Sequence, residues 1–302
     1  MKELFYLLFK GIFMEKITEL TLSVPGSTFA GKHATVYMEP EAAPRAAVLY
    51  FHGGGLVYGS RRDLPESHIR ALLDHHYAVI AFDYPLAPQS GLETILADAA
   101  ASVNSFLADP TVFGLPARLP YILWGRSAGA YLALLAVSKG LLSAPPAGIL
   151  SYYGYGLLTD NWLDVPNPYY CTLPRVERSV LQSLTQNPRM EASPEQDAAG
   201  FSLYVFGRQS GSWPSLFFDG SLAALYSQFS LRGCTSLGCP LLCAHSMNDV
   251  DVPFSEFSAL SLRFSAQRLI APGNIHDFDR LESAATGRLL KTTLDFLDRC
   301  LA

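Results

Sequence analysis

A serine at a sharp change of backbone direction is the first residue whose surroundings suggest chemistry. The stretch YILWGRSAGAYLALLAV, residues 121–137, begins as an apolar β-type run and ends as a helix of small residues. Between them, GRSAG at 125–129 is G-x-S-x-G, which fits a strained turn that lifts a serine hydroxyl above the end of a sheet. Its glycines permit unusual backbone angles. Ser127 is therefore a candidate nucleophile, and the alternative is a glycine-rich turn without chemistry.

Donors for a developing oxyanion are available upstream of this serine. In VLYFHGGGLVYGS, residues 48–60, an apolar strand runs into His52 and three glycines. The amides of Gly54 and Gly55, together with that of Ala128 after the serine, are the expected oxyanion hole. His52 is expected to orient this loop. A phosphate cradle is the weaker interpretation, because the Walker lysine is absent and no G-x-G-x-x-G helix start follows; a flexible turn is the remaining alternative.

A weak serine nucleophile also needs a base and an acid that orients the base. Among the seven histidines, His245 and His276 follow the serine, as the order Ser, acid, His requires. His245 lies in the strand-like LLCAHS and suits a packed core histidine, whereas His276 lies in a loop before the final helix. The preceding loop offers Asp249 and Asp251. We prefer Asp249, because Asp251 leads into the next helix, but the sequence leaves this choice open.

The composition restricts the classes of function. At 302 residues, with 49% hydrophobic and 16% charged residues, the chain has the make-up of a well-buried globular protein. A net charge of −5 without a lysine or arginine run argues against a nucleic-acid partner. Five cysteines without a regular framework predict free thiols in a reducing compartment. Cys239 and Cys243 lack the further ligands that a zinc site needs, so we expect no metal and no cofactor.

The N-terminal stretch MKELFYLLFKGIFMEK is a separate question. Glu3 and Lys10 interrupt an apolar run that is too short for a secretory core or a bilayer span. We expect residues 1–13 to form a short helix that packs on the domain or covers the mouth of the site. The alternatives are a poor signal peptide and upstream sequence joined to a start at Met14. The expected location is the cytoplasm, without stable membrane insertion.

The elements that must position these residues alternate along the chain. Short β-type runs followed by longer helical runs are typical of a mostly parallel sheet flanked by helices. Strands are expected at 17–24, 33–38, 46–51, 77–82, 120–124, 147–152, 240–245 and 267–271. Helices are expected at 66–75, 91–107, 128–139, 254–264 and 283–300. The first two strands join without a helix, which predicts an antiparallel pair.

The alternation stops between Tyr153 and Leu237, where aromatic residues, prolines and glycines are frequent. Because a long structureless loop is improbable in a compact domain, we interpret 153–237 as an inserted helical cap over the strand ends. The core then comprises 1–152 and 238–302. A separate small domain or an oligomer interface is the alternative. The aromatic residues of this segment suggest an apolar pocket, or simply packing within the cap: Tyr153, Tyr155, Trp162, Tyr169, Tyr170, Trp213, Phe217 and Phe218.

On the basis of these residues, the sequence resembles those of proteins with the α/β-hydrolase fold and, among them, the hormone-sensitive-lipase-like esterases. The resemblance runs from about residue 30 to the end, apart from the inserted segment. It is carried by HGGG at 52–55, GRSAG at 125–129 and DYPLAP at 83–88, which is similar to the D-Y-R-L-A-P that shapes the loop behind the oxyanion hole in that family. VDVP after Asp249 and HDF at 276–278 are also similar to the acid and histidine loops of the fold.

Several positions depart from that family. Arg126 stands where an acidic residue usually precedes the nucleophile, Pro85 replaces the usual arginine, and Gln89 replaces the glutamate that commonly follows. The long insertion also differs from a cap built largely from N-terminal helices. Acylaminoacyl-peptidase-like members share the GRSAG spelling, but they normally carry a propeller that this chain is too short to hold. We expect Arg126 to be solvated or to form a structural salt bridge; bracing of the cap and contact with an acidic group of the substrate are the alternatives.

The residues and the resemblance together predict a serine carboxylic-ester hydrolase that acts on small or short-chain esters. Ser127 would attack the ester, His276 would be the base and Asp249 would orient it. An amide hydrolase of the aryl-formamidase or peptidase type would use the same residues, and a non-catalytic binding protein is the remaining alternative. The expected partner is a small-molecule ester; the sequence leaves open whether the chain forms a homodimer.

Overall fold

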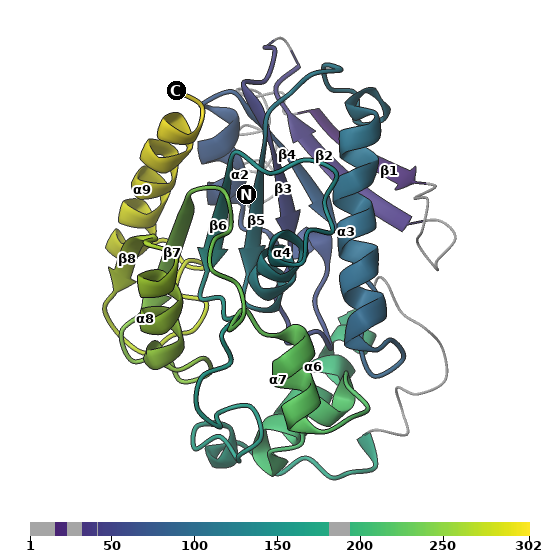
Figure 1. The fold of residues 1–302 in the computed structure, drawn as a ribbon, viewed down its shortest axis with the longest axis vertical. Helices are drawn as coiled ribbons and strands as arrows, with labels where there is room; N and C mark the ends of the chain where they lie inside the picture. Colours follow the sequence, from purple (N-terminus) through teal and green to yellow (C-terminus); the bar gives the residue numbers. More distant parts are fainter. Residues whose placement is uncertain (1–15, 23–31, 41, 181–193) are drawn as a thin grey trace, which may run out of the picture.

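A central sheet organises the chain. The computed structural model describes residues 16–22, 32–40, 42–180 and 194–302; the expected helix at 1–13 lies outside them. The described residues form an eight-stranded sheet in the order β1-β2-β4-β3-β5-β6-β7-β8 (Figure 1). Its strands are β1 (Lys16–Leu22), β2 (Lys32–Met38), β3 (Ala46–Phe51), β4 (Tyr77–Phe82), β5 (Tyr121–Arg126), β6 (Gly148–Tyr152), β7 (Leu241–Ser246) and β8 (Gln267–Ala271).

The strand directions agree with the sequence pattern. β1 pairs with β2 and β2 with β4 in antiparallel fashion, and the remaining neighbours are parallel. The predicted fold, a mostly parallel sheet of about eight strands flanked by helices, is therefore confirmed. The strand order reverses at β3, which has β4 on one side and β5 on the other. In open α/β sheets the ligand crevice lies at such a switch point, beyond the carboxyl ends of the strands.

Helices cover both faces of the sheet. They are α2 (Glu66–Leu73), α3 (Leu92–Ala108), α4 (Ala128–Ser138), α6 (Pro194–Ser210), α7 (Leu222–Phe229), α8 (Phe254–Arg263) and α9 (Ala284–Cys300). One core contains buried residues of α3, α4 and α8, and the other those of α2 and α9. Successive β3 residues contribute to the two cores in turn, with Leu49 in the first and Val48 in the second. A strand buried on both faces explains the continuous apolar run AAVLYF.

The segment between β6 and β7 is partly helical, as expected. It contains η3 (Tyr170–Thr172), α6, η4 (Trp213–Leu216) and α7. Figure 1 shows α6 and α7 together at one end of the sheet, away from α9. The division into a core and a cap at 153–237 stays a prediction, but these helices lie where they can contact the loops that leave the strand ends.

Candidate active site

The turn at Ser127 has the strained geometry that its sequence predicts. Ser127 adopts φ 51° and ψ −117° between β5 and α4. A Cβ at Gly125 would lie 2.2 Å from the amide nitrogen of Ala130, and one at Gly129 would lie 2.1 Å from the carbonyl oxygen of Phe51. Both glycines are therefore needed for the close passage of strand and helix. A non-glycine residue with positive φ costs on the order of 1–3 kcal/mol, so the packing around the turn must hold Ser127 in place.

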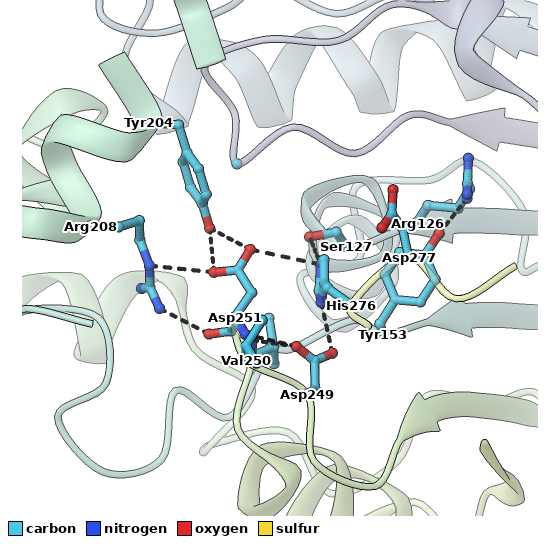
Figure 2. A network of polar contacts seen from close by, with 12 residues as sticks. Arg126, Ser127, Tyr153, Tyr204, Arg208, Asp249, Val250, Asp251, His276 and Asp277 are labelled. Carbon is cyan, nitrogen blue, oxygen red and sulfur yellow. Dashed lines mark hydrogen bonds and ion pairs between the residues drawn. The ribbon is translucent and has the colours of Figure 1, made fainter. Parts of the chain in front are cut away.

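The three residues predicted as nucleophile, base and acid lie within hydrogen-bond distance of one another (Figure 2). His276, in the loop between β8 and α9, has Nε2 2.9 Å from Ser127 Oγ and Nδ1 2.7 Å from Asp249 Oδ2. Asp249 follows β7, and its carboxylate is fully buried. Its Oδ1 accepts the amides of Asp251 and Val252 at 2.8 and 3.1 Å. The acid is thus fixed by its own loop and in turn orients the imidazole.

The electrostatics favour this orientation. Burial by itself lowers the pKa of His276, but Asp249, and then Asp251 and Asp277, raise it to about 9. Burial would raise the pKa of Asp249, yet the interactions with His276 and His245 hold it below its ordinary value. Asp249 therefore stays a carboxylate, which keeps the Nδ1 proton of His276 directed at it. Nε2 is then the nitrogen that can take a proton from Ser127.

The glycine loop presents free backbone donors beside Ser127. Gly54 and Gly55 have φ 99° and 59°, and a Cβ at Gly54 would lie 2.0 Å from the carbonyl oxygen of Tyr58. Within the described residues, the amides of Gly54, Gly55 and Ala128 donate no hydrogen bond. Unpaired N–H groups at a helix start and in a glycine turn are what an oxyanion would require.

Residues of the DYPLAP stretch, 83–88, contact the backbone of the glycine loop and hold it in place. Tyr84 donates its hydroxyl proton between the carbonyl oxygens of His52 and Gly53, at 2.9 and 3.1 Å. The rings of Tyr84 and buried His52 stack at 4.1 Å between centroids. Asp83 accepts the Arg61 amide at 2.8 Å and pairs with its guanidinium. His52 is thus packed beside the loop, and its role in orienting the glycines stays a prediction.

A small, polar cavity adjoins the serine. Its volume is about 50 Å³. A water molecule in the liquid occupies about 30 Å³, so the cavity has room for a small chemical group. The lining residues are Gly53, Gly54, Gly55, Tyr58, Asp63, Arg126, Ser127, Tyr153, Tyr204, Asp251, His276, Asp277 and Arg280. Of the eight aromatic residues considered for an apolar pocket, all of them described, Tyr153 alone borders it. The apolar pocket therefore stays a prediction, and the other seven residues do not line this cavity.

A buried ion pair, whose partner residue sequence reasoning missed, joins the serine turn to the histidine loop. Arg126 Nη2 lies 2.8 Å from Asp279 Oδ1, and both side chains are buried. The same oxygen accepts the Tyr153 hydroxyl at 2.8 Å, and His68 Nε2 lies 3.1 Å from Asp279 Oδ2. Arg126 therefore has the structural salt bridge that we expected as one alternative, and it is not solvated. Burial would raise the pKa of Asp279, but Arg126 and His68 lower it, so Asp279 is a carboxylate.

Sequence reasoning also missed two contacts of the acid loop. Asp251, interpreted as a lead into the next helix, lines the cavity, and its Oδ2 lies 4.0 Å from His276 Nε2. His245 is fully buried against Phe257, as a core histidine would be. Its Nε2 nevertheless lies 3.4 Å from Asp249 Oδ2. The spacing D-x-D and the histidine four residues before Asp249 were the available signals.

The rest of the described chain offers no metal cluster. No group of three or more His, Cys, Asp or Glu side chains that could hold a metal ion occurs among the described residues. In that part of the chain, no helix is both long and apolar enough to cross a bilayer.

Comparisons with solved structures support the fold. The chain superposes with a TM-score of 0.78 on a protein of unknown function from Staphylococcus aureus Mu50, at 24% identity over 94% of this chain and 100% of that one. An α/β hydrolase superfamily protein from Enterococcus faecalis gives 0.77 at 21% identity, covering 95% and 100%. Carboxyl esterase 2 from Tuber melanosporum gives 0.62 at 18% identity, covering 96% and 88%. At these identities the likeness establishes the fold alone.

Comparisons with known sequences give one family model and several relatives that match parts of the chain. The family model described as alpha/beta hydrolase fold matches residues 48–196. Non-reducing polyketide synthase ausA of Emericella nidulans is 28% identical over 80% of this chain but 11% of its own length. Arylacetamide deacetylase-like 2 of Homo sapiens is 29% identical over 44% of this chain and 34% of its own length. The chain spans about a tenth of the first polyketide synthases that it matches, 7% and 11% of their lengths.

The fold and these matches identify an α/β-hydrolase fold, and esterases are among the proteins to which the chain is similar. Residues 48–196 match the α/β-hydrolase family model, and the resemblance to its hormone-sensitive-lipase-like esterases is supported.

Proposed function

We propose that the protein is a serine carboxylic-ester hydrolase that acts on small esters. One observation carries the proposal: Ser127 Oγ, both ring nitrogens of His276 and the carboxylate of Asp249 form a continuous chain of contacts at 2.9 and 2.7 Å. Carboxyl esterase 2 of Tuber melanosporum has a similar fold, so the fold is compatible with this class of reaction. The cavity of about 50 Å³ favours substrates with a small group next to the ester carbonyl.

The reaction follows from the positions of these groups. His276 Nε2 takes the proton of Ser127 as the serine oxygen bonds to the ester carbonyl carbon. The amides of Gly54, Gly55 and Ala128 hold the resulting oxyanion, and loss of one such donor typically costs about 3–4 kcal/mol of transition-state stabilisation. The carbon–oxygen bond to the alcohol then breaks, and the leaving oxygen receives the proton from His276.

Water completes the cycle on the acyl-serine. His276 takes a proton from the water as its oxygen bonds to the acyl carbon. The bond to Ser127 then breaks, the serine oxygen recovers the proton, and the carboxylic acid leaves. Asp249 keeps its charge throughout and stabilises the imidazolium that forms in both halves of the cycle. No cofactor is needed for these steps.

The direct test is hydrolysis of p-nitrophenyl acetate, butyrate and octanoate by the wild type and by Ser127→Ala. We expect kcat to fall by at least about a thousandfold in the variant, because catalysis that remains without the nucleophile is small. The acetate should be the best substrate. Equal rates for the two proteins on every ester would refute the proposal.

An amide hydrolase remains the second candidate, because one of the matched relatives is named arylacetamide deacetylase-like 2. The same residues would act, but His276 would protonate a leaving amine. Wild-type kcat/KM on p-nitrophenyl acetate and on p-nitroacetanilide separates the two. We expect the ester to react faster relative to its hydroxide-catalysed rate, and a preference for the anilide on that scale would favour the amide hydrolase.

A further inference from the structure

A second carboxylate, that of Asp251, faces the catalytic side of the imidazole. Asp249 contacts Nδ1 of His276, whereas Asp251 Oδ2 lies 4.0 Å from Nε2, the nitrogen that also contacts Ser127 (Figure 2). This separation is too long for a hydrogen bond. Asp251 is 6% exposed and borders the cavity. One of its oxygens is therefore available to a molecule bound beside Ser127.

The hydrogen bonds of Asp251 leave room for one more donor. Tyr204 lies 2.8 Å from Oδ1 and 2.9 Å from Oδ2, but its hydroxyl has a single proton, and the shorter contact is to Oδ1. Tyr170 donates to Oδ2 at 3.1 Å, and Arg208 Nε lies 3.4 Å from Oδ1. A carboxylate can accept about four hydrogen bonds. Arg208 Nε makes no hydrogen bond, so among the described residues the two tyrosine protons leave an acceptor direction on Oδ2, the oxygen nearer to His276.

Arg208 fixes this carboxylate and balances its charge. Arg208 is buried on α6, and its Nη2 donates to the carbonyl oxygen of Asp251 at 2.9 Å. Its guanidinium also lies over the rings of Trp162 and Trp213, at 5.2 and 5.3 Å from the centroids. Because a buried cation already neutralises Asp251, the remaining acceptor direction suits a neutral donor such as a hydroxyl better than a second cation.

The position of the leaving group follows from the reaction. The leaving oxygen must come within about 2.6–3.2 Å of His276 Nε2 to take its proton. Asp251 Oδ2 lies 4.0 Å from that same nitrogen. Because Ser127, His276 and Asp251 border the same cavity, we place the alcohol part of the ester beside Asp251. A hydroxyl on the carbon adjacent to the ester-bearing carbon can bridge from the leaving oxygen to Oδ2.

We propose that Asp251 is a specificity-determining residue that accepts a hydrogen bond from such a hydroxyl, so that the preferred substrates are small esters of vicinal diols or polyols. This inference rests on the proposed esterase function and names its substrate class. The lining of the cavity is consistent with a hydroxylated alcohol, because it includes five charged side chains: Asp63, Arg126, Asp251, Asp277 and Arg280.

Matched substrates test the inference without any variant. The wild type is assayed on 2-hydroxyethyl acetate, 2-methoxyethyl acetate and propyl acetate by continuous titration of the acid released, each rate divided by that with hydroxide alone. The methoxy ester keeps the oxygen but lacks the proton. A hydrogen bond to a charged group should make kcat/KM for the hydroxy ester about tenfold or more higher than for the other two.

The variant Asp251→Asn locates the effect. It should lower the preference for 2-hydroxyethyl over 2-methoxyethyl acetate by about tenfold, because a charge-assisted bond is lost. The ratio of the two kcat/KM values does not depend on how much variant is folded or on the pKa of His276. Asp277→Asn is the matched control, since it removes another carboxylate of the same cavity, one that pairs with Arg280. It should leave the preference unchanged.

The outcomes separate this inference from the function on which it rests. Equal normalised rates on the three acetates, with activity that depends on Ser127, would overturn the role of Asp251 and leave the esterase proposal standing. A preference that Asp251→Asn does not reduce would also overturn it. No hydrolysis of any ester would instead overturn the esterase proposal itself.

Discussion

His276 is surrounded by more negative charge than the single acid of a triad supplies. Asp249 contacts one ring nitrogen at 2.7 Å, and Asp251 lies 4.0 Å from the other. Asp277 is its neighbour in sequence and also borders the cavity. Burial opposes the charge on the imidazole, but the carboxylates prevail and raise the pKa of His276 to about 9. A base of this kind is largely protonated at neutral pH and must lose that proton before it can accept one from Ser127.

The pH dependence of ester hydrolysis should reflect the raised pKa of His276. Because the neutral imidazole is the active form, kcat/KM for an uncharged alkyl acetate should rise with pH, with its midpoint near 9 and above the ordinary value for histidine. Continuous titration of the acid released measures the profile. It runs from about pH 6, about three units below the midpoint, to about pH 10, about one unit above it. Asp277→Asn should shift the midpoint to lower pH. A plateau already reached near pH 7 would contradict the charge environment described for His276.

Single residues were predictable where a local pattern marks them. Ser127 follows from five consecutive residues, and His276 and Asp249 follow from chain order and from loops after apolar runs. Asp251 was interpreted as a lead into the next helix, with its role as the acid left open, and its partners are distant in sequence: Tyr204 and Arg208 lie on α6. No local periodicity connects these segments, so the sequence could not reveal that contact.

At the scale of elements, the loop that carries His276 is fastened to the end of β5. Arg126, the last residue of β5, pairs with Asp279, and the ring of Tyr153 lies 4.7 Å from that of His276. His68 on α2 contacts the second oxygen of Asp279. Three elements thus converge on one buried carboxylate three residues after His276, and this fixes the histidine loop relative to Ser127.

Removal of the negative charge of Asp279 should lower the free energy of unfolding. In Asp279→Asn the buried guanidinium of Arg126 loses its counter-ion, so the free energy of unfolding should fall by about 3–5 kcal/mol. Urea denaturation at pH 7 measures the change. Asp295→Asn is the control, because the side chains of Asp295 and its partner Lys291 are largely exposed and such pairs contribute about 0–1 kcal/mol. Similar losses in the two variants would refute a structural role for the buried pair.

The limits of the strands were predicted well from the sequence. The helices between β6 and β7 and their contacts were predicted less well. All eight strands lie within two residues of their predicted limits, and the buried parallel strands among them, such as β3, β4 and β5, are continuous apolar runs bounded by turns. The helices of the inserted segment had no predicted limits. The pattern of α6, PEQDAAGFSLYVFGRQS, mixes buried aromatic and polar positions, since residues such as Arg208 are buried to make ion pairs.

At the scale of the whole molecule, the inserted segment and the sheet share the site. Trp213 in η4 donates Nε1–H to the carbonyl oxygen of Gly55 at 3.0 Å, and Asp197 on α6 accepts the amide of Gly59 at 2.6 Å. A second link lies just after β6, where the inserted segment begins. There buried Glu256 on α8 accepts the amides of residues 156–159 at 2.7–3.0 Å. The glycine loop is thus held by residues far from it in sequence.

This link can be tested at Trp213. Trp213→Phe keeps an aromatic ring but removes the bond to Gly55, so kcat/KM on a small ester should fall by about two- to tenfold. Trp162→Phe is a matched control, because within the described chain the buried Nε1 of Trp162 has no hydrogen-bond partner. Its kcat/KM should change by less than about twofold. Equal losses would indicate that ring packing, rather than the hydrogen bond, supports the loop.

The Arg126–Asp279 pair also constrains how this sequence can be recombined with its relatives. Esterases that the chain resembles usually carry an acidic residue at the position of Arg126. A chimera that inherited such an elbow together with the present C-terminal third would place two carboxylates against each other in a buried site. Gene shuffling and homologue grafting should therefore treat the two segments, 153 residues apart, as one inherited unit.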